Sequence, residues 1–246
     1  MLMNSPFDPG VSARPLRERA RRIELIADNP AFDAWLALVE TRDLADLPPE
    51  DWLSAPERAQ AAAYSFARRR ESYVLGRLAA KLALGASLSE PDWTRIDVGR
   101  GLLGQPLANH PGPRRVEVSL SHTDGLAAAI AFPREMSAGI DVEIVDVDRA
   151  DTVRKELRFQ PAEEKWLRSG MMEARSACVM LWTLREALGK ALRCGLSCPL
   201  ELLSASELKP LGGGGWESRY QNFAQYRCLS WVDSARVLSL AVARIP

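Results

Sequence analysis

The stretch SLSHTDGLAAAIAFPREMSAGIDVEIV, residues 119–145, constrains the fold more than any other part of this sequence. It contains three short runs that are either alternating or continuously apolar, and turn residues separate them at Asp124-Gly125 and at PREMS. Runs of this length and period are typical of strands. The pattern therefore predicts three consecutive strands, with the second and third forming a hairpin across PREMS.

The last of these strands carries two acids. Asp141 and Glu143 stand two residues apart and share one face of the strand, whereas Ile140, Val142 and Ile144 fill the other face. A solvated strand face is the ordinary explanation of such a pair. A hard cation is the alternative, because Mg²⁺ binds a few carboxylate oxygens and takes the rest of its ligands from water and substrate phosphates.

A third acid lies on a predicted helix, SACVMLWTLREALGKALRCG, which we expect to end at Gly195. Trp182, Glu186 and Lys190 are spaced i, i+4, i+8 and lie along one stripe of that helix. A surface Glu–Lys pair is the alternative. The tryptophan indicates a partly enclosed stripe, and enclosed charges need partners. A metal for Glu186 and a phosphate for Lys190 would supply them.

Ser121 and His122 end a predicted strand just before a turn. A small hydroxyl and an imidazole at a strand end form a suitable set of phosphate contacts. A structural histidine is the alternative interpretation. The pair lies directly upstream of the acidic strand, which favours a combined metal and phosphate site.

The N-terminal half supplies a basic cluster. Arg68, Arg69 and Arg70 are consecutive, and Arg77 and Lys81 share a helix face. These cations form either a solvated basic face or a clamp for a polyanionic ligand, in which guanidinium groups bind phosphate oxygens.

The rest of the chain suggests two halves of similar size. Residues 1–22 are rich in proline and arginine and are predicted to form a flexible arm. Pro111-Gly112-Pro113 is the strongest boundary, which gives an N-terminal subdomain at 23–112 and a C-terminal subdomain at 113–246. Ser54 followed by Glu57 predicts a capped helix over the alanine-rich run that follows, and RCLSWV and VLSLAVARI predict closing strands.

Composition narrows the class of protein. Thirty-two basic residues balance thirty-two acidic ones, so the overall charge gives no reason to expect nucleic acid or a membrane as a partner. The start of the chain has no apolar core of signal-peptide length, and no segment is long enough to span a bilayer. We therefore expect a cytoplasmic protein with reduced thiols. Cys194 and Cys198 do not predict zinc, because only two histidines accompany them.

Together these motifs resemble the signature of 4'-phosphopantetheinyl transferases of the surfactin-synthetase-activating type. That signature has a Ser-His pair, then G-[IV]-D-[VIL]-E, then W-x-x-K-E-A-x-x-K about forty residues later. Here the blocks read SLSH, GIDVE and WTLREALGK. LLGQP is similar to the upstream G-K-P motif, and the resemblance covers most of the chain beyond about Leu47.

The resemblance implies an α+β fold of two similar α/β subdomains related by a pseudo-twofold axis, with coenzyme A in the cleft between them. It implies a Mg²⁺-dependent enzyme that transfers the 4'-phosphopantetheine arm of coenzyme A to a serine of an acyl or peptidyl carrier protein and releases 3',5'-ADP. It also implies a monomer, because one chain would build the whole cleft.

Site residues follow from the same resemblance. Asp141, Glu143 and Glu186 match the Mg²⁺ ligands, and Lys190 matches the lysine that contacts the pyrophosphate. The proposed contacts with coenzyme A are Ser121, His122, Arg100, Arg77 and the cluster Arg68, Arg69 and Arg70, with Arg68 the best match to the 3'-phosphate. Glu186, Lys190 and His122 are the expected catalytic residues, with Glu186 taking the serine proton.

Three residues depart from the family pattern. Gln105 replaces the lysine of G-K-P, Arg185 replaces the lysine before Glu186, and Arg193 stands where glycine is common. A coenzyme-A-binding protein without transferase activity is therefore an alternative function. A Mg²⁺-dependent phosphohydrolase is another, although the chain lacks the second acid cluster typical of two-metal sites. A scaffold with exposed acids is the third.

Overall fold

The computed structural model describes residues 5–25, 32–45 and 47–243 and divides into two compact units. The N-terminal unit contains residues 9–25 and 32–136. The C-terminal unit contains residues 137–243 together with residues 5–8. Each unit is described separately below.

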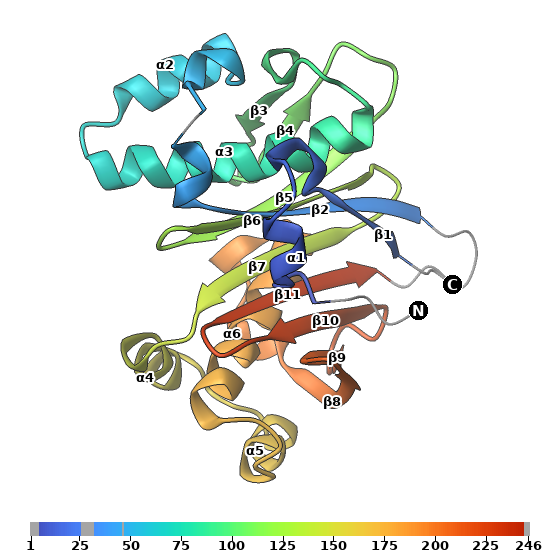
Figure 1. The fold of residues 1–246 in the computed structure, drawn as a ribbon. Coiled ribbons are helices and arrows are strands. Elements are labelled where there is room, and N and C mark those ends of the chain that lie inside the picture. The colour runs from blue at the N-terminus through green and yellow to red at the C-terminus, as the bar shows by residue number, and fades with distance from the viewer. Residues whose placement is uncertain (1–4, 26–31, 46, 244–246) are drawn as a thin grey trace. The chain divides into compact units, whose positions relative to one another are not determined.

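The N-terminal unit is an antiparallel sheet with strand order β1-β2-β6-β5, covered by helix α3 (Figure 1). Strands β3 and β4 form a separate hairpin, and β4 lies beside β5. The elements of this unit are α1 (Pro9–Ser12), β1 (Arg21–Leu25), β2 (Phe32–Glu40), α2 (Ala55–Ala63), α3 (Ala67–Leu88), β3 (Asp97–Arg100), β4 (Pro106–Asn109), β5 (Val116–Thr123) and β6 (Leu126–Pro133).

Helix α2 begins at the capping box that the sequence predicts. The Ser54 side chain accepts from the Glu57 backbone N–H at 3.4 Å, and the Glu57 carboxylate accepts from the Ser54 N–H at 2.9 Å. Glu57 is buried and forms an ion pair with the fully buried Lys81 of α3 at 2.7 Å. It also accepts from the Val98 N–H of β3 at 3.0 Å. One carboxylate therefore connects α2, α3 and β3.

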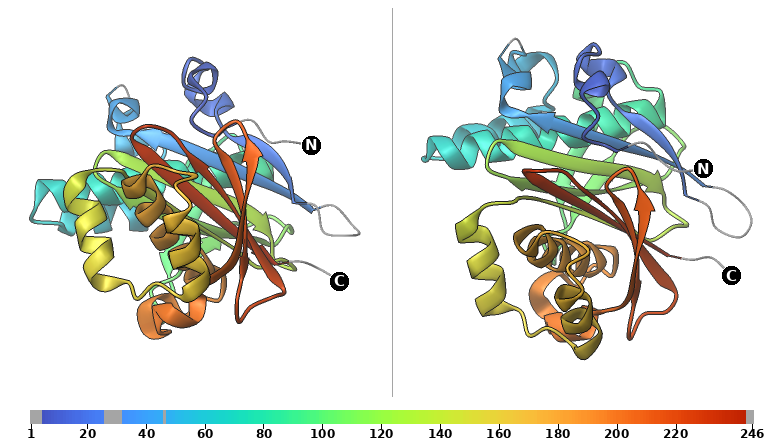
Figure 2. Two further views of the ribbon diagram at one scale, coloured as in Figure 1. Left: turned by 90° about the horizontal axis from the view of Figure 1, so that it is seen from below. Right: turned by 60° about the horizontal axis from the view of Figure 1, so that its bottom comes forward.

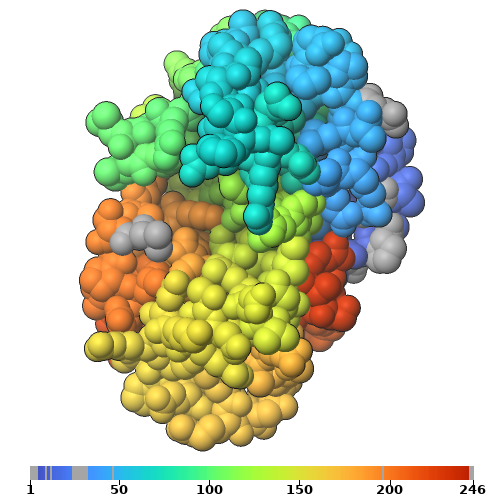
Figure 3. All heavy atoms as spheres, turned by 90° about the vertical axis from the view of Figure 1, so that its left-hand side faces the viewer, coloured from blue at the N-terminus to red at the C-terminus, as the bar shows by residue number. Residues whose placement is uncertain are grey.

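The C-terminal unit is one antiparallel sheet with strand order β7-β11-β10-β9-β8. Helix α6 packs on β7, β10 and β11, and α4 and α5 lie beside α6 (Figure 2). In Figure 3 the residues of α4 and α5, in yellow tones, form much of the visible surface of this unit. Its elements are β7 (Ala138–Ile144), α4 (Val147–Glu156), α5 (Pro161–Arg168), α6 (Ala174–Ala191), β8 (Ala205–Gly212), β9 (Gly215–Tyr220), β10 (Tyr226–Val232) and β11 (Arg236–Ala243).

A buried glutamate also connects three elements of the C-terminal unit. Glu163 forms a capping box with Gln160 at the start of α5. Its carboxylate forms an ion pair with Arg185 of α6, and both side chains are fully buried. It also accepts from the Ala205 N–H of β8 at 3.0 Å. This is the arrangement of Glu57, with arginine in place of lysine.

The two units share one order of elements. Each has a strand, a short capped helix, a long helix, a strand hairpin and two more strands; α1 and β1 are additions to the N-terminal unit, and α4 is an addition to the C-terminal unit. The first strand of this shared order pairs antiparallel with its last strand in both units, as β2 does with β6 and β7 with β11. This confirms the prediction of an α+β fold with two similar α/β subdomains. The pseudo-twofold axis stays a prediction.

Two predictions about chain organisation differ from the structure. The hairpin across PREMS is wrong, because β6 pairs with β2 and β5 whereas β7 pairs with β11 in the other sheet. The units divide between residues 136 and 137 rather than at Pro111–Pro113, because β5 and β6 complete the N-terminal sheet.

The predicted arm, residues 1–22, is held to the N-terminal unit over part of its described length. Arg17 lies over the Trp93 ring, 4.5 Å from its centroid, and Arg19 forms an ion pair with Asp43 at 2.5 Å. Residues 1–4 lie outside the described residues. No helix within residues 5–25, 32–45 or 47–243 is long and apolar enough to cross a membrane.

Helix α6 ends at Ala191, four residues before the predicted Gly195. The Arg193 and Cys194 N–H groups donate to the Lys190 and Gly189 carbonyls, both at 3.1 Å, which places Arg193 in the left-handed position of this helix end with φ +57°. Glycine is preferred there because it has no Cβ to clash.

We expect Arg193→Gly to raise the free energy of unfolding by about 0.5–1 kcal/mol, because relief of strain exceeds the entropy cost of glycine. Urea unfolding measures this. Arg168→Gly, at the right-handed end of α5, is the control and should lower stability. A less stable Arg193→Gly variant would contradict this explanation of the helix end.

Candidate functional site

A close approach of α6 to β7 positions the acids of the C-terminal unit. A Cβ on Gly139 would lie 2.2 Å from the Ala187 carbonyl oxygen and 2.4 Å from the Ala191 nitrogen, both in α6. Only glycine allows this approach. Asp141 follows two residues later on β7, opposite Ser239 of β11. The glycine of GIDVE therefore brings the acidic strand against the helix that carries Glu186.

Two positively charged side chains form ion pairs with acids of this cluster. Lys190 donates to Asp141 Oδ1 at 2.7 Å, and the Asp141 side chain is 5% exposed. Arg149, in the first turn of α4, donates to Glu143 Oε1. The sequence predicted Asp141, Glu143 and Lys190 as one site but did not identify Arg149, whose partner lies six residues away.

Glu186 completes the cluster from α6. Burial raises the pKa of the Glu186 carboxyl above its ordinary value, the charge of Asp141 raises it further, and Lys190 and Arg149 oppose both effects. Its Oε1 atom is buried without a hydrogen-bond partner among the residues that the structure describes. A buried carboxylate oxygen of this kind is normally satisfied by a water, an ion or a ligand.

These residues fit a hard divalent cation. Asp141 and Glu186 are close enough for the charge of one to raise the pKa of the other, and oxygen ligands of this type suit Mg²⁺. Within the described parts of the chain, no three His, Cys, Asp or Glu side chains are gathered closely enough to be a complete metal site. Glu143 instead contacts Arg149.

The N-terminal unit places several predicted phosphate contacts around the turn between β5 and β6. The exposed Arg68 forms an ion pair with Asp124 at 2.5 Å. The exposed His122 ring lies against α3, where a Cβ on Gly76 would be 3.5 Å from its Cδ2 atom. Ser121 is buried, and Arg69 and Arg70 are exposed in the first turn of α3. The fold thus brings residues that are 56 positions apart, Arg68 and Asp124, to one end of this unit.

The other predicted cations have different environments. Arg77 lies over the Tyr73 ring at 4.5 Å and 3.6 Å from Glu57, and its side chain is 13% exposed. Lys81 is fully buried and donates to the Trp93 and Ile96 carbonyls as well as to Glu57. Arg77 and Lys81 therefore stabilise the interior of the N-terminal unit. These two cations do not form a clamp for a polyanionic ligand.

The hairpin between β3 and β4 carries Arg100 and Gln105. Arg100 is exposed and packs over Gly104, whose φ is +82°. The Gln105 side chain accepts from the Leu103 N–H at 3.0 Å and lies against Gly101. Gln105 therefore stabilises its own turn.

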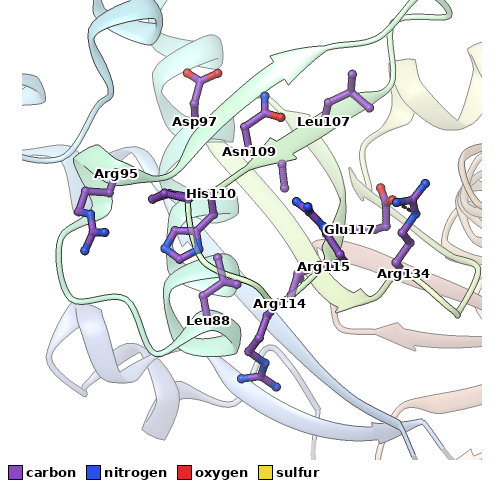
Figure 4. Close-up of a pocket in the computed structure, with 13 residues that line it drawn as sticks. Leu88, Arg95, Asp97, Leu107, Asn109, His110, Arg114, Arg115, Glu117 and Arg134 are labelled. Carbon is purple, nitrogen blue, oxygen red and sulfur yellow. Dashed lines mark ion pairs between the residues drawn. The ribbon is translucent and has the colours of Figure 1, made fainter.

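A cavity of about 570 Å³ lies elsewhere in the N-terminal unit, between the ends of β3 and β4 and the start of β5 (Figure 4). Three of its four arginines have partners: Arg95 contacts Glu90 at 3.0 Å, Arg134 lies 4.0 Å from Glu117, and Arg114 donates to the Ser87 carbonyl. None of the predicted site residues lines it.

Residues 137–243, which contain the acid cluster, match the model of the 4'-phosphopantetheinyl transferase superfamily. Over 107 residues the chain is 39% identical to the 4'-phosphopantetheinyl transferase Npt of Nocardia iowensis. The aligned part is 43% of this chain, and the chain spans 44% of the length of this relative.

Two solved structures are also similar. One is a holo-(acyl-carrier-protein) synthase from Bacillus anthracis in complex with CoA (3',5'-ADP), with 24% identity, a TM-score of 0.37, and coverage of 41% of this chain and 93% of that one. The other is the holo-[acyl-carrier-protein] synthase of Thermotoga maritima, with 23% identity, a TM-score of 0.34, and coverage of 52% and 78%.

The departure from the family pattern at Arg185 has a physical explanation. The guanidinium is fully buried, forms an ion pair with Glu163 and donates to the Arg158 and Leu200 carbonyls. It therefore lies in the core of the C-terminal unit rather than at the acid cluster. The buried carboxylate of Glu163 needs a cation at this position. Arginine supplies that charge with more hydrogen-bond donors than lysine has.

We expect Glu186→Gln to be more stable than the unmodified protein at neutral pH in the presence of a chelator. The pKa of the Glu186 carboxyl is raised in the folded protein, so its neutral form contributes stability at low pH. That contribution is lost as the pH rises through the folded-state pKa. Glutamine stays neutral, so its advantage should appear at pH 7 and fade below the ordinary glutamate pKa. Urea unfolding at both pH values measures this, with the exposed Glu164→Gln as control. Equal stability at pH 7 would contradict the enclosed environment of Glu186.

Proposed function

We propose that this protein transfers the 4'-phosphopantetheine moiety of coenzyme A to a serine hydroxyl of an acyl or peptidyl carrier protein. One observation supports this most strongly. The superfamily match covers the segment in which Glu186 presents a buried, unpartnered oxygen beside the Asp141–Lys190 pair. Such a cluster suits a metal ion and a diphosphate together.

Asp141, Glu143 and Glu186 would hold Mg²⁺, which when bound neutralises diphosphate charge and makes the phosphorus more electrophilic. The serine oxygen forms a bond to the β-phosphorus, and the bond from that phosphorus to the bridging oxygen breaks. The phosphopantetheine arm stays on the serine, and 3',5'-ADP leaves with the electron pair. Lys190, which pairs with Asp141, would neutralise charge on the diphosphate.

Glu186 is the proposed acceptor of the serine proton. Coenzyme A contacts are proposed for His122, Ser121, Arg100 and the exposed cluster Arg68, Arg69 and Arg70. Arg77 is left out of this proposal because Glu57 and Tyr73 already surround its guanidinium.

We also propose a monomeric, cytoplasmic enzyme of the surfactin-synthetase-activating type.

Incubation with coenzyme A, Mg²⁺ and apo carrier proteins tests the proposal by intact-mass spectrometry. We expect the carrier to gain the mass of one phosphopantetheine arm, and a carrier with alanine at the acceptor serine to gain nothing. Binding of coenzyme A without any carrier modification would favour a binding protein. Cleavage of coenzyme A without a carrier would favour a phosphohydrolase, and either result would contradict the transferase.

A further inference from the structure

Arg149 is the residue of the acid cluster that sequence patterns did not reveal. It lies in the first turn of α4, where its backbone N–H donates to the N-cap residue Asp146 at 2.7 Å. Its side chain is only 23% exposed and contacts Glu143. The guanidinium also lies over the Trp182 ring, 4.5 Å from the ring centroid. Arg149 is therefore held by three elements, α4, β7 and α6.

The contact with Trp182 fixes the guanidinium independently of Glu143. A planar guanidinium on an aromatic face gains both stacking and cation–π attraction. Trp182 shares its helix stripe with Glu186 and Lys190. If Glu143 bound another cation, Arg149 would keep its place over the ring and stay beside the cluster as a positive charge.

The charge of the cluster is close to balanced. When all five are ionised, the carboxylates Asp141, Glu143 and Glu186 and the cationic side chains Arg149 and Lys190 together carry a charge of −1. A divalent cation must compete with Lys190 for Asp141 and with Arg149 for Glu143. Metal affinity at oxygen sites decreases when the ligands supply less net negative charge. Because two cationic side chains offset most of the charge of the acids, the protein alone is a poor divalent-cation site.

We propose that Arg149 and Lys190 make divalent-cation binding at this site depend on a bound diphosphate. A diphosphate brings at least two negative charges, which give both cationic side chains new partners and restore an excess of negative charge around the metal. The coupling is reciprocal, so the metal must strengthen diphosphate binding by the same factor. This inference rests on the proposed function, because it concerns the same site.

Titration calorimetry with Mn²⁺ tests the inference without turnover. In the unmodified protein, Mn²⁺ should bind weakly alone and at least about tenfold more tightly with saturating coenzyme A. Added 3',5'-ADP, which has two separate phosphates and no diphosphate, should not produce this gain. Arg149→Gln should bind Mn²⁺ alone about tenfold more tightly, with a smaller gain from coenzyme A.

Two variants separate charge from other effects. Arg149→Lys keeps the charge but loses the planar contact with Trp182, and it should retain the weak Mn²⁺ binding of the unmodified protein. Lys155→Gln removes an exposed positive charge from the same helix and should change nothing. Weaker Mn²⁺ binding in both Arg149 variants would mean that the residue orients Glu143, and it would overturn the inference.

The outcomes also distinguish the inference from the proposed function. Tight Mn²⁺ binding to the protein alone, unchanged in Arg149→Gln, overturns the inference and leaves the metal site of the transferase intact. Absence of Mn²⁺ binding in every mixture overturns both.

Discussion

Asp141→Asn should reduce the rate of carrier modification by at least about 10³-fold. The substitution removes one charge from the predicted metal ligands and thereby the ion pair with the Lys190 ammonium group. Metal and charge contributions to a phosphoryl-type transition state amount to several kcal/mol, and each 1.36 kcal/mol corresponds to about a tenfold change in rate. The measurement is the initial rate of holo-carrier formation at saturating Mg²⁺ and coenzyme A.

Asp148→Asn is the matched control for this experiment. Asp148 lies exposed in α4, seven residues further along the chain, and the chemical change is the same. Its rate should stay within about twofold of the unmodified protein, in keeping with the small effects of surface substitutions. Circular dichroism and a urea midpoint would verify that Asp141→Asn is folded. A folded variant with full activity would exclude Asp141 from the metal site.

Glu163→Ala should lower the free energy of unfolding by about 3–5 kcal/mol, the usual cost of breaking a buried ion pair from one side. The substitution leaves the Arg185 guanidinium, fully buried, without its carboxylate, and it leaves the Ala205 N–H without its acceptor. Because α5, α6 and β8 all meet at this carboxylate, we expect the C-terminal unit to be affected as a whole. Urea unfolding followed by fluorescence measures the loss.

Glu164→Ala is the control for this prediction. Glu164 is the next residue of the same helix, its side chain is 50% exposed, and its ion pair with Arg168 is a surface i, i+4 contact. Such pairs contribute only a few tenths of a kcal/mol. A similar loss in both variants would show that the helix position, rather than the buried pair, determines stability.

Local signals in the sequence predicted much of the fold. The Ser54–Glu57 capping box marks the start of α2, and hydrogen bonds within four residues determine such a boundary. Helix α6, β10 and β11 were also predicted, since apolar periodicity reports the type of an element. Periodicity does not report the sheet to which a strand belongs. The turn between β6 and β7 therefore suggested a hairpin, whereas these strands lie in different sheets.

The candidate site was predictable to the extent that its residues share a strand or a helix stripe. Asp141 and Glu143 share β7, and Glu186 and Lys190 share α6. The partners that cross between elements were not predictable. Lys81 was assigned either to a solvated basic face or to a phosphate clamp, and Arg185 was noted only as a substitution beside Glu186, but each pairs in the core with a glutamate more than twenty residues away. Helical periodicity alone does not distinguish a buried ion pair from a phosphate contact.

The stoichiometry of the reaction tests the central claim most directly. With coenzyme A, Mg²⁺ and an apo carrier protein, the amounts of holo-carrier and of 3',5'-ADP can be measured in one reaction by mass spectrometry and nucleotide chromatography. The proposed transfer predicts one 3',5'-ADP released for each carrier modified on its serine, and none in the absence of carrier. Release of 3',5'-ADP without modified carrier, or unchanged coenzyme A with every acyl and peptidyl carrier tested, would contradict it.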